Sequence, residues 1–269
     1  MKLGYIDFIN CYPFYYHMFE RNTVKNITII SGYPGKLNNM LFKGELDMSP
    51  ISSATCADIH EDIVIMPQFC LSSVGYVGSV TLASNIPIEE LDKKKIGVTN
   101  ASHTSAVLLK ILLKKYYNAQ PDYITTGPRP ELKSFDATLL IGNDAMIKTS
   151  QPPTYTYDLG DMWLRKTGYP VVFAVFVIKR DIIKKYSSQI NAVAASYKLS
   201  LNCLKNEKIK VIAKAKAKYP DVIYDINKYY ELLKFEFTDE LKQALMFYFQ
   251  QGSNLGLIQK VDSINFADL

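Results

Sequence analysis

The feature that most constrains the fold is a recurring unit in which a short apolar strand ends in polar residues and turns directly into a helix. In the opening stretch 1–17, a strand over 2–8 stops near Asn10, and Pro13 ends the extended geometry before a helix begins. Three later segments repeat this order: 46–53, 95–105 and 137–145. Strands that alternate with helices in this way predict an α/β protein with a mainly parallel sheet.

The junctions between strand and helix carry hydroxyl and amide side chains. Asn10 offers two donors and an acceptor, Ser52 and Ser53 open the second helix, and the sequence SHTS opens a third helix at 102–105. The free N–H groups and the dipole at a helix start favour a carboxylate or a phosphate. The alternative for Asn10, Ser52 and Ser53 is that they only cap their helices or turns.

Two further expectations concern strands and caps near these junctions. Residues 63–66 form a strand and 70–74 a possible second one, while 75–83 is a further strand with Gly78 and Ser79 inside it. Glycine inside a strand often marks the close approach of a ligand or another backbone. Asp158 is expected to cap the helix that follows it rather than to act in catalysis.

The order of the elements indicates two lobes with a ligand cleft between them. A polar, turn-rich stretch follows Ala83, and a continuous apolar strand returns the chain at 171–178 before a mostly helical end. We therefore expect a discontinuous first lobe of residues 1–83 and 173–269, which includes a helical C-terminal tail, and a second lobe of residues 84–172. Several strand-to-helix junctions then face the cleft, where small molecules usually bind.

Composition excludes several classes of protein. Hydrophobic residues make up 48% and charged residues 21% of the 269 residues, no apolar run is long enough to span a bilayer, and no secretory signal pattern is present. Four cysteines without CxxC spacing predict free thiols in a reducing cytoplasm rather than a metal site. The net charge of +5 suits an anionic small ligand better than nucleic acid, and the lysine-rich stretch 186–218 is predicted to be solvated surface.

Six segments in one order resemble the chorismate dehydratase family of the futalosine route to menaquinone. The segments are YIDFINCYP at 5–13, LDMSPISS at 46–53, VGSVTLAS at 77–84, SHTSAVLLKILL at 102–113, LLIGNDAM at 139–146 and YDLGDMWLRKTGYPVVFAV at 157–175. The resemblance covers nearly the whole chain and is weakest between residues 186 and 235. Each motif alone is weak, but six in register are specific.

The resemblance implies a two-lobed fold of the type II periplasmic-binding-protein kind used as an enzyme. The family is a hydro-lyase that removes water from chorismate to give 3-[(1-carboxyvinyl)oxy]benzoate, with no metal or organic cofactor and no nucleic-acid or membrane partner. Its catalytic residues map onto Asn10 and Ser79. By position, the resemblance also implies four cleft neighbours: Ser52, Thr104, Ser105 and Asp144. The oligomeric state does not follow from it.

The reaction removes a proton from the carbon that bears the enolpyruvyl ether. It also expels the neighbouring hydroxyl group. The helix start at 102–105, from Ser102 to Ser105, is expected to hold one substrate carboxylate, and Ser52 or Ser53 the other. No Glu, Lys or unambiguous His lies in the motifs as a base, so we hypothesise that a carboxylate of chorismate itself takes the proton. His103 departs from the family pattern, in which a smaller residue is usual, and is predicted to be only a polar residue of the first helical turn.

Two alternatives from other classes stay open. One is a non-catalytic binding protein for a small carboxylate, because this fold more often binds than reacts. The other is the sister dihydroxynaphthoate synthase of the same route. Its N-terminal strand resembles SPCPNDT, a sequence that is missing from the opening strand here.

Overall fold

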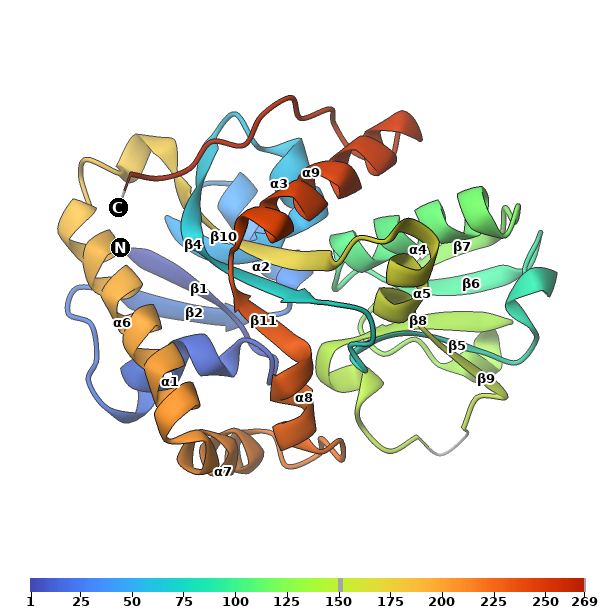
Figure 1. Ribbon diagram of the computed structural model, residues 1–269, viewed down its shortest axis with the longest axis horizontal. Coiled ribbons are helices and arrows are strands. Elements are labelled where there is room, and N and C mark those ends of the chain that lie inside the picture. The colour runs from blue at the N-terminus through green and yellow to red at the C-terminus, as the bar shows by residue number, and fades with distance from the viewer. Residues whose placement is uncertain (150–151, 269) are drawn as a thin grey trace.

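The protein is described by a computed structural model over residues 1–149 and 152–268, and it contains two β-sheets that lie side by side (Figure 1). The strands of the first sheet are β1 (Lys2–Ile6), β2 (Thr28–Gly32), β3 (Met48–Ser52), β4 (Ile63–Ser73), β10 (Val171–Lys179) and β11 (Leu233–Glu236). Those of the second sheet are β5 (Val80–Ser84), β6 (Lys95–Thr99), β7 (Asp122–Thr126), β8 (Ala137–Ile141) and β9 (Tyr155–Asp158). Two sheets with separate helices give the two-lobed arrangement that the sequence predicts.

The helices complete the two lobes. They are α1 (Tyr12–Glu20), α2 (Pro34–Phe42), α3 (Ser53–Asp58), α4 (His103–Tyr116), α5 (Leu159–Thr167), α6 (Ser187–Asn206), α7 (Lys208–Lys218), α8 (Ile226–Leu232) and α9 (Asp239–Asn254). Short 3-10 turns add η1 (Ile88–Glu90), η2 (Leu132–Ser134), η3 (Gly142–Ala145) and η4 (Arg180–Ile182). Helices α4 and α5 lie beside the second sheet, and the other helices surround the first, where both chain ends also lie (Figure 1).

The sheets are mixed, and the expectation of a mainly parallel sheet is wrong. In the order β11-β4-β10-β3-β1-β2, β1 is parallel to β2 and β3, whereas β10 is antiparallel to β3 and β4. In the order β7-β6-β8-β5-β9, β6 is parallel to β7 and β8, whereas β5 is antiparallel to β8 and β9. Strands joined by helical crossovers run parallel, but β5 and β10 enter their sheets from the other lobe and run in the opposite direction.

Two local expectations are corrected. The segments 63–66 and 70–74 belong to one strand, β4, whose pairing with β10 shifts register between Ile65 and Cys70. This bulge accommodates Pro67, which cannot donate a ladder hydrogen bond. Residues 75–79 are turns rather than the first half of a strand, because Gly75 and Gly78 have φ values of +77° and +74°.

Sheet membership also bears on the lobe boundaries. The expected first lobe includes residues up to 83, but β5 pairs with β8 and β9 of the second sheet. We propose that the chain crosses between the lobes at residues 74–79 and returns at 168–170, just before β10 enters the first sheet. Ser79 then lies on a connection between the lobes, not inside a strand.

An aromatic core fixes the end of β1 against the rest of the first lobe. The Phe14 and Phe176 rings of this core lie 4.3 Å apart between centroids, and the Tyr197 hydroxyl donates to the Tyr15 hydroxyl at 2.7 Å. Each favourable ring pair contributes about 0.5–1.5 kcal/mol beyond its buried area. Because Phe14 and Tyr15 sit on α1, this packing holds the turn at Asn10, which directly precedes the helix, in a defined place.

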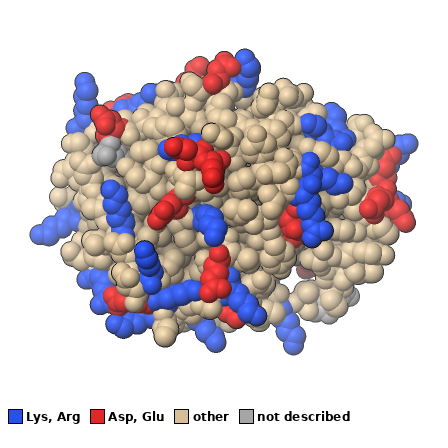
Figure 2. Space-filling view, viewed as in Figure 1, with Lys and Arg blue, Asp and Glu red and all other residues tan. Residues whose placement is uncertain are grey.

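The basic residues of the C-terminal half form solvated ion pairs. Lys208 pairs with Glu231 at 2.7 Å, Lys210 with Glu207 at 2.8 Å, and Lys214 with Glu20 at 2.6 Å. Figure 2 shows basic and acidic side chains interspersed on the viewed face. Across the described ranges, no helix combines the length and apolar character that crossing a membrane requires.

Candidate functional site

A narrow cavity of about 40 Å³ lies between the two lobes. Apolar side chains such as Phe8, Val77 and Phe173 form much of its wall. Its polar lining consists of Asn10, Ser52, Ser79, Ser102 and Ser105. These five sequence-predicted residues come from four separate segments of the chain, so the tertiary fold brings the strand-to-helix junctions together at one place.

Asn10 presents an acceptor without a partner to this cavity. Its side-chain Oδ1 is buried and makes no hydrogen bond to any described residue. The neighbouring backbone is fixed, because the Ile9 N–H donates to Asn143 Oδ1 at 2.9 Å and Tyr230 donates to the Ile9 carbonyl at 3.0 Å. The helix start is Cys11, with no side-chain cap, so helix capping does not account for Asn10. A buried acceptor left unpaired costs about 1–3 kcal/mol, which points to a donor supplied by a ligand.

Ser79 is held in place by a buried carboxylate. Asp158 accepts hydrogen bonds from the backbone N–H groups of Val77 (3.2 Å) and Gly78 (2.7 Å), and it caps α5 through the N–H of Asp161 at 3.0 Å. The predicted cap is therefore confirmed, and it also fixes the turn that leads to Ser79. Burial raises the pKa of Asp158, while the backbone donors act in the opposite direction.

Removing the Asp158 carboxylate is expected to destabilise this turn strongly. The variant Asp158→Ala loses a helix cap and leaves the N–H groups of Val77 and Gly78 buried without an acceptor, for a total loss of about 3 kcal/mol. Urea unfolding of the two proteins measures this difference. Asp262→Ala is the control, because that carboxylate is 80% exposed in a surface ion pair. If Asp158→Ala loses no more stability than this control, the assigned role is contradicted.

The two helix starts at the cavity differ in how their serines are used. Ser102 caps α4, since its hydroxyl accepts from the Ser105 N–H at 3.3 Å and donates to Ser105 Oγ at 3.1 Å. Ser52 occupies the cap position of α3 but makes no capping hydrogen bond with its side chain. Ser102 is therefore a helix cap. Ser52 is not, so its hydroxyl is available to a ligand in the cavity.

Three of the predicted residues do not line the cavity. The Ser53 hydroxyl donates to the Val172 carbonyl at 2.7 Å, and the Thr104 hydroxyl donates to the Phe173 carbonyl at 2.8 Å. Both bonds tie a helix start to the same end of β10. Asp144 is buried and forms an ion pair with Arg129. Burial raises the pKa of Asp144 against the opposing effect of that guanidinium.

The lobes touch on both sides of the cavity. The Gly35 N–H at the start of α2 donates to the Ala101 carbonyl at 3.0 Å, and the ring of Phe8 lies against Gly142, which has a φ of +56°. A β-carbon at Gly35 would lie 2.2 Å from the Asn100 carbonyl oxygen. Contacts this close require glycine and set the distance between the lobes.

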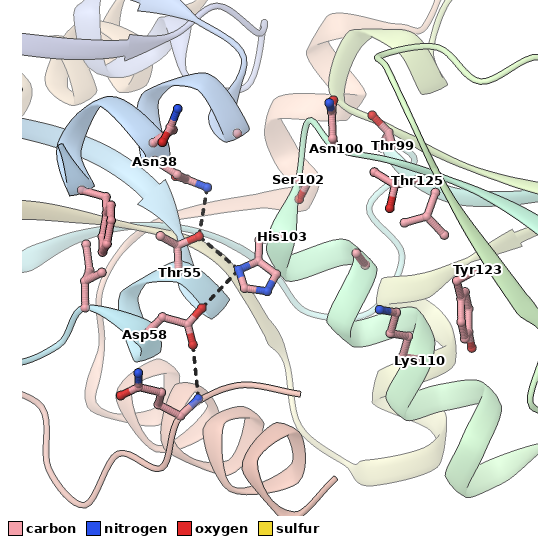
Figure 3. Close-up of a pocket in the computed structure, with 17 residues that line it drawn as sticks. Asn38, Thr55, Asp58, Thr99, Asn100, Ser102, His103, Lys110, Tyr123 and Thr125 are labelled. Carbon is pink, nitrogen blue, oxygen red and sulfur yellow. Dashed lines mark hydrogen bonds and ion pairs between the residues drawn. The ribbon is translucent and has the colours of Figure 1, made fainter. Parts of the chain in front are cut away.

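A wider groove of about 590 Å³ lies between α3 and α4, with Ser102 on the wall that it shares with the cavity (Figure 3). His103 points into it, with Nδ1 3.2 Å from Thr55 Oγ1 and 3.6 Å from the Asp58 carboxylate. His103 thus joins the two lobes and does not line the cavity with Asn10. Burial lowers the pKa of His103, with Asp58 acting against this shift and Lys110 adding to it.

His103 should make stability depend on pH. Because its folded-state pKa is lowered, the unfolded chain binds more protons than the folded one once the pH falls below about 6.5. The contribution of neutral His103 to the free energy of unfolding is therefore lost as the pH falls from about 6.5 toward the lowered pKa. Between about pH 7 and pH 5, we expect the melting temperature to fall less for His103→Asn than for the wild type. Scanning calorimetry measures this difference. An equal loss in both proteins would contradict this role.

One residue at the site escapes the sequence analysis. Tyr229 of α8 is buried, and its hydroxyl lies 2.7 Å from Ser79 Oγ. It lies 150 positions from Ser79 along the chain, in a tyrosine pair that resembles an ordinary core segment. No local motif marks it, so only the fold shows its position.

The fold defines the class of protein. The structure matches the periplasmic aliphatic sulphonate binding protein of Escherichia coli with a TM-score of 0.67 at 16% identity, over 100% of this chain and 94% of that one. The fold is therefore that of the periplasmic binding proteins, with a cavity between two α/β lobes. The predicted fold class is confirmed.

Sequence comparison then gives the family. Residues 1–254 match the family model described as menaquinone biosynthesis, and the chain belongs to this family. A relative from Thermus thermophilus named chorismate dehydratase is 29% identical over 196 residues, which cover 66% of this chain and 70% of that protein. A relative from Campylobacter jejuni with the same name is 25% identical over 198 residues, which cover 69% and 74% respectively.

Proposed function

We propose that this protein is a chorismate dehydratase, a hydro-lyase that converts chorismate and releases one water to give 3-[(1-carboxyvinyl)oxy]benzoate. The observation that carries the proposal is the meeting of Asn10 and Ser79 in one cavity between the lobes. Membership of the menaquinone biosynthesis family and the names of the two relatives support it. The four free cysteines suit a reducing compartment, and we place the reaction in the cytoplasm.

The cavity offers complementary polar atoms to the reacting part of chorismate. The unpaired Oδ1 of Asn10 can accept a hydrogen bond from the hydroxyl of the bound substrate and so orient it before it departs. The Ser79 hydroxyl can donate a hydrogen bond to the same oxygen as negative charge develops on it. Donors positioned in a site that excludes water stabilise such charge far better than bulk solvent does.

The two substrate carboxylates need fixed partners. The start of α4, with Ser102 and Ser105, presents N–H groups and hydroxyls to one of them. The Ser52 hydroxyl in the first lobe makes no capping hydrogen bond and is available to the other substrate carboxylate. These partners belong to different lobes, and the cavity of about 40 Å³ is far smaller than the roughly 300–1,000 Å³ of ordinary ligand pockets. The lobes must therefore separate to admit the substrate, which then links them.

The cavity lining contains no carboxylate, imidazole or amine among the described residues. We therefore keep the hypothesis that a carboxylate of chorismate takes the proton, with the cavity holding it near the carbon that loses that proton. Such intramolecular positioning can replace a separate base, since effective molarities reach about 10⁵ M or more. Loss of turnover in His103→Asn or Asp144→Asn, with folding and chorismate binding intact, would contradict substrate-assisted proton removal.

The test of the proposed function is incubation of the purified protein with chorismate, followed by mass analysis of the product. We expect catalytic loss of one water. Unchanged chorismate that nevertheless raises the melting temperature would favour the binding-protein alternative. Unchanged chorismate without a thermal shift would favour the sister synthase, which acts on another substrate.

A further inference from the structure

The hydroxyl of Tyr229 reaches one of the two residues on which the proposed function depends. It donates a hydrogen bond to Ser79 Oγ at 2.7 Å. Tyr229 is 1% exposed, so water does not compete for this contact. The adjacent Tyr230 binds the Ile9 carbonyl at 3.0 Å, which places α8 firmly against the end of β1.

The direction of this hydrogen bond is clear. The Tyr229 hydroxyl donates to Ser79 Oγ, and a phenol is a better donor than an aliphatic alcohol. Asn10 Oδ1 has no partner among the described residues, so it does not compete for the phenolic hydrogen.

This order leaves one hydrogen available. Ser79 already accepts from Tyr229, so its own hydrogen can be donated into the cavity. Asn10 lines the same cavity, and its Oδ1 has no partner among the described residues. Burial also raises the pKa of Tyr229 well above its ordinary value, which keeps the phenol protonated and its hydrogen in place.

We propose that Tyr229 is a positioning residue that holds Ser79 with its own hydrogen directed toward the substrate, in the cavity that Asn10 also lines. The inference rests on the proposed dehydratase function. In a chain of this kind each bond strengthens the next by polarisation. Tyr229 itself does not touch the substrate; it acts through Ser79.

The test is the steady-state kinetics of Tyr229→Phe with chorismate. We expect kcat to fall about tenfold, with KM changed less than about twofold because the carboxylate partners are untouched. Tyr157→Phe is the control, since it also removes a tyrosine hydroxyl that takes part in a hydrogen bond, accepting from the Ile88 N–H at 3.0 Å, but Tyr157 lies on β9 and does not line the cavity. The control should keep wild-type kcat.

A double-mutant comparison separates positioning from a purely structural effect. If Tyr229 acts through Ser79, Tyr229→Phe should reduce kcat much less in a Ser79→Ala background than in the wild type. Equal fold-losses in the two backgrounds, or wild-type kcat in Tyr229→Phe, would overturn the inference and leave the proposed function standing. Absence of chorismate turnover in the wild type would overturn both.

Discussion

Replacing Asn10 or Ser79 by alanine is expected to lower kcat for chorismate about 10²–10³-fold, the loss that removal of one positioned polar group usually causes. Both side chains line the cavity. The effect of Asn10→Ala on folding should be small, because Asn10 Oδ1 has no partner to lose in the protein and the variant removes a buried acceptor that itself opposes folding. Ser79→Ala leaves the buried Tyr229 hydroxyl without its acceptor, at a cost of about 1–3 kcal/mol in stability.

The measurement is kcat together with the melting temperature for each variant. Asn22→Ala and Ser134→Ala are the controls, because both side chains are of the same type and lie exposed on the surface. Full turnover in both Asn10→Ala and Ser79→Ala would remove these residues from the mechanism. A loss of turnover that parallels a loss of melting temperature would assign them a structural role instead.

Adding a single methyl group at Gly35 is expected to lower kcat/KM about 100-fold without unfolding either lobe. The new β-carbon would lie 2.2 Å from the Asn100 carbonyl oxygen in the opposite lobe, so the lobes must separate by about an ångström. A displacement of this size at a reacting centre typically costs about 10² in rate. Within α2 itself, alanine is a better helix former than glycine, so the local fold should not suffer.

Gly127→Ala is the control for this variant. A β-carbon there meets nothing within 4 Å, and the residue lies in a loop of the second lobe. We expect wild-type kcat/KM for Gly127→Ala and a melting temperature close to the wild type for both proteins. Unchanged kcat/KM in Gly35→Ala would show that catalysis does not need the lobe contact present in this structure.

Much of the site could be predicted because it is local in sequence. Asn10, Ser52, Ser102 and Ser105 stand where an apolar strand turns into a helix, and the structure places all of them at the cavity. Strand ends and helix starts depend on neighbouring residues, through hydrophobic period, proline and capping preference. These preferences act over a few residues and can be read without knowing the fold.

The same local reasoning fails for residues whose partners are distant. Ser53 and Thr104 occupy helix starts of the same kind, yet their hydroxyls bind the carbonyls of Val172 and Phe173 at the end of β10. Whether a hydroxyl faces a cavity or a neighbouring strand depends on which strand lies beside it. The pairing of β10 with β3 and β4 decides this, and no local pattern encodes it.

Two strands outside the predicted set illustrate the same limit. β9 and β11 are four-residue strands at the edges of their sheets. Strands this short gain most of their stability from the partner strand rather than from their own sequence. The mostly helical end expected from the sequence agrees with α8, whereas the extended continuation into β11 was not predicted.

The sequence by itself determined the α/β class, the two lobes, and the polar strand-to-helix junctions, because short-range sterics and hydrophobic periodicity set all of these. The tertiary structure alone decided that the sheets are mixed, that Ser79 follows a turn held by Asp158, and that Tyr229 reaches Ser79. Such contacts join segments far apart in the chain. They exist only once the packing of the whole core has fixed the relative positions of those segments.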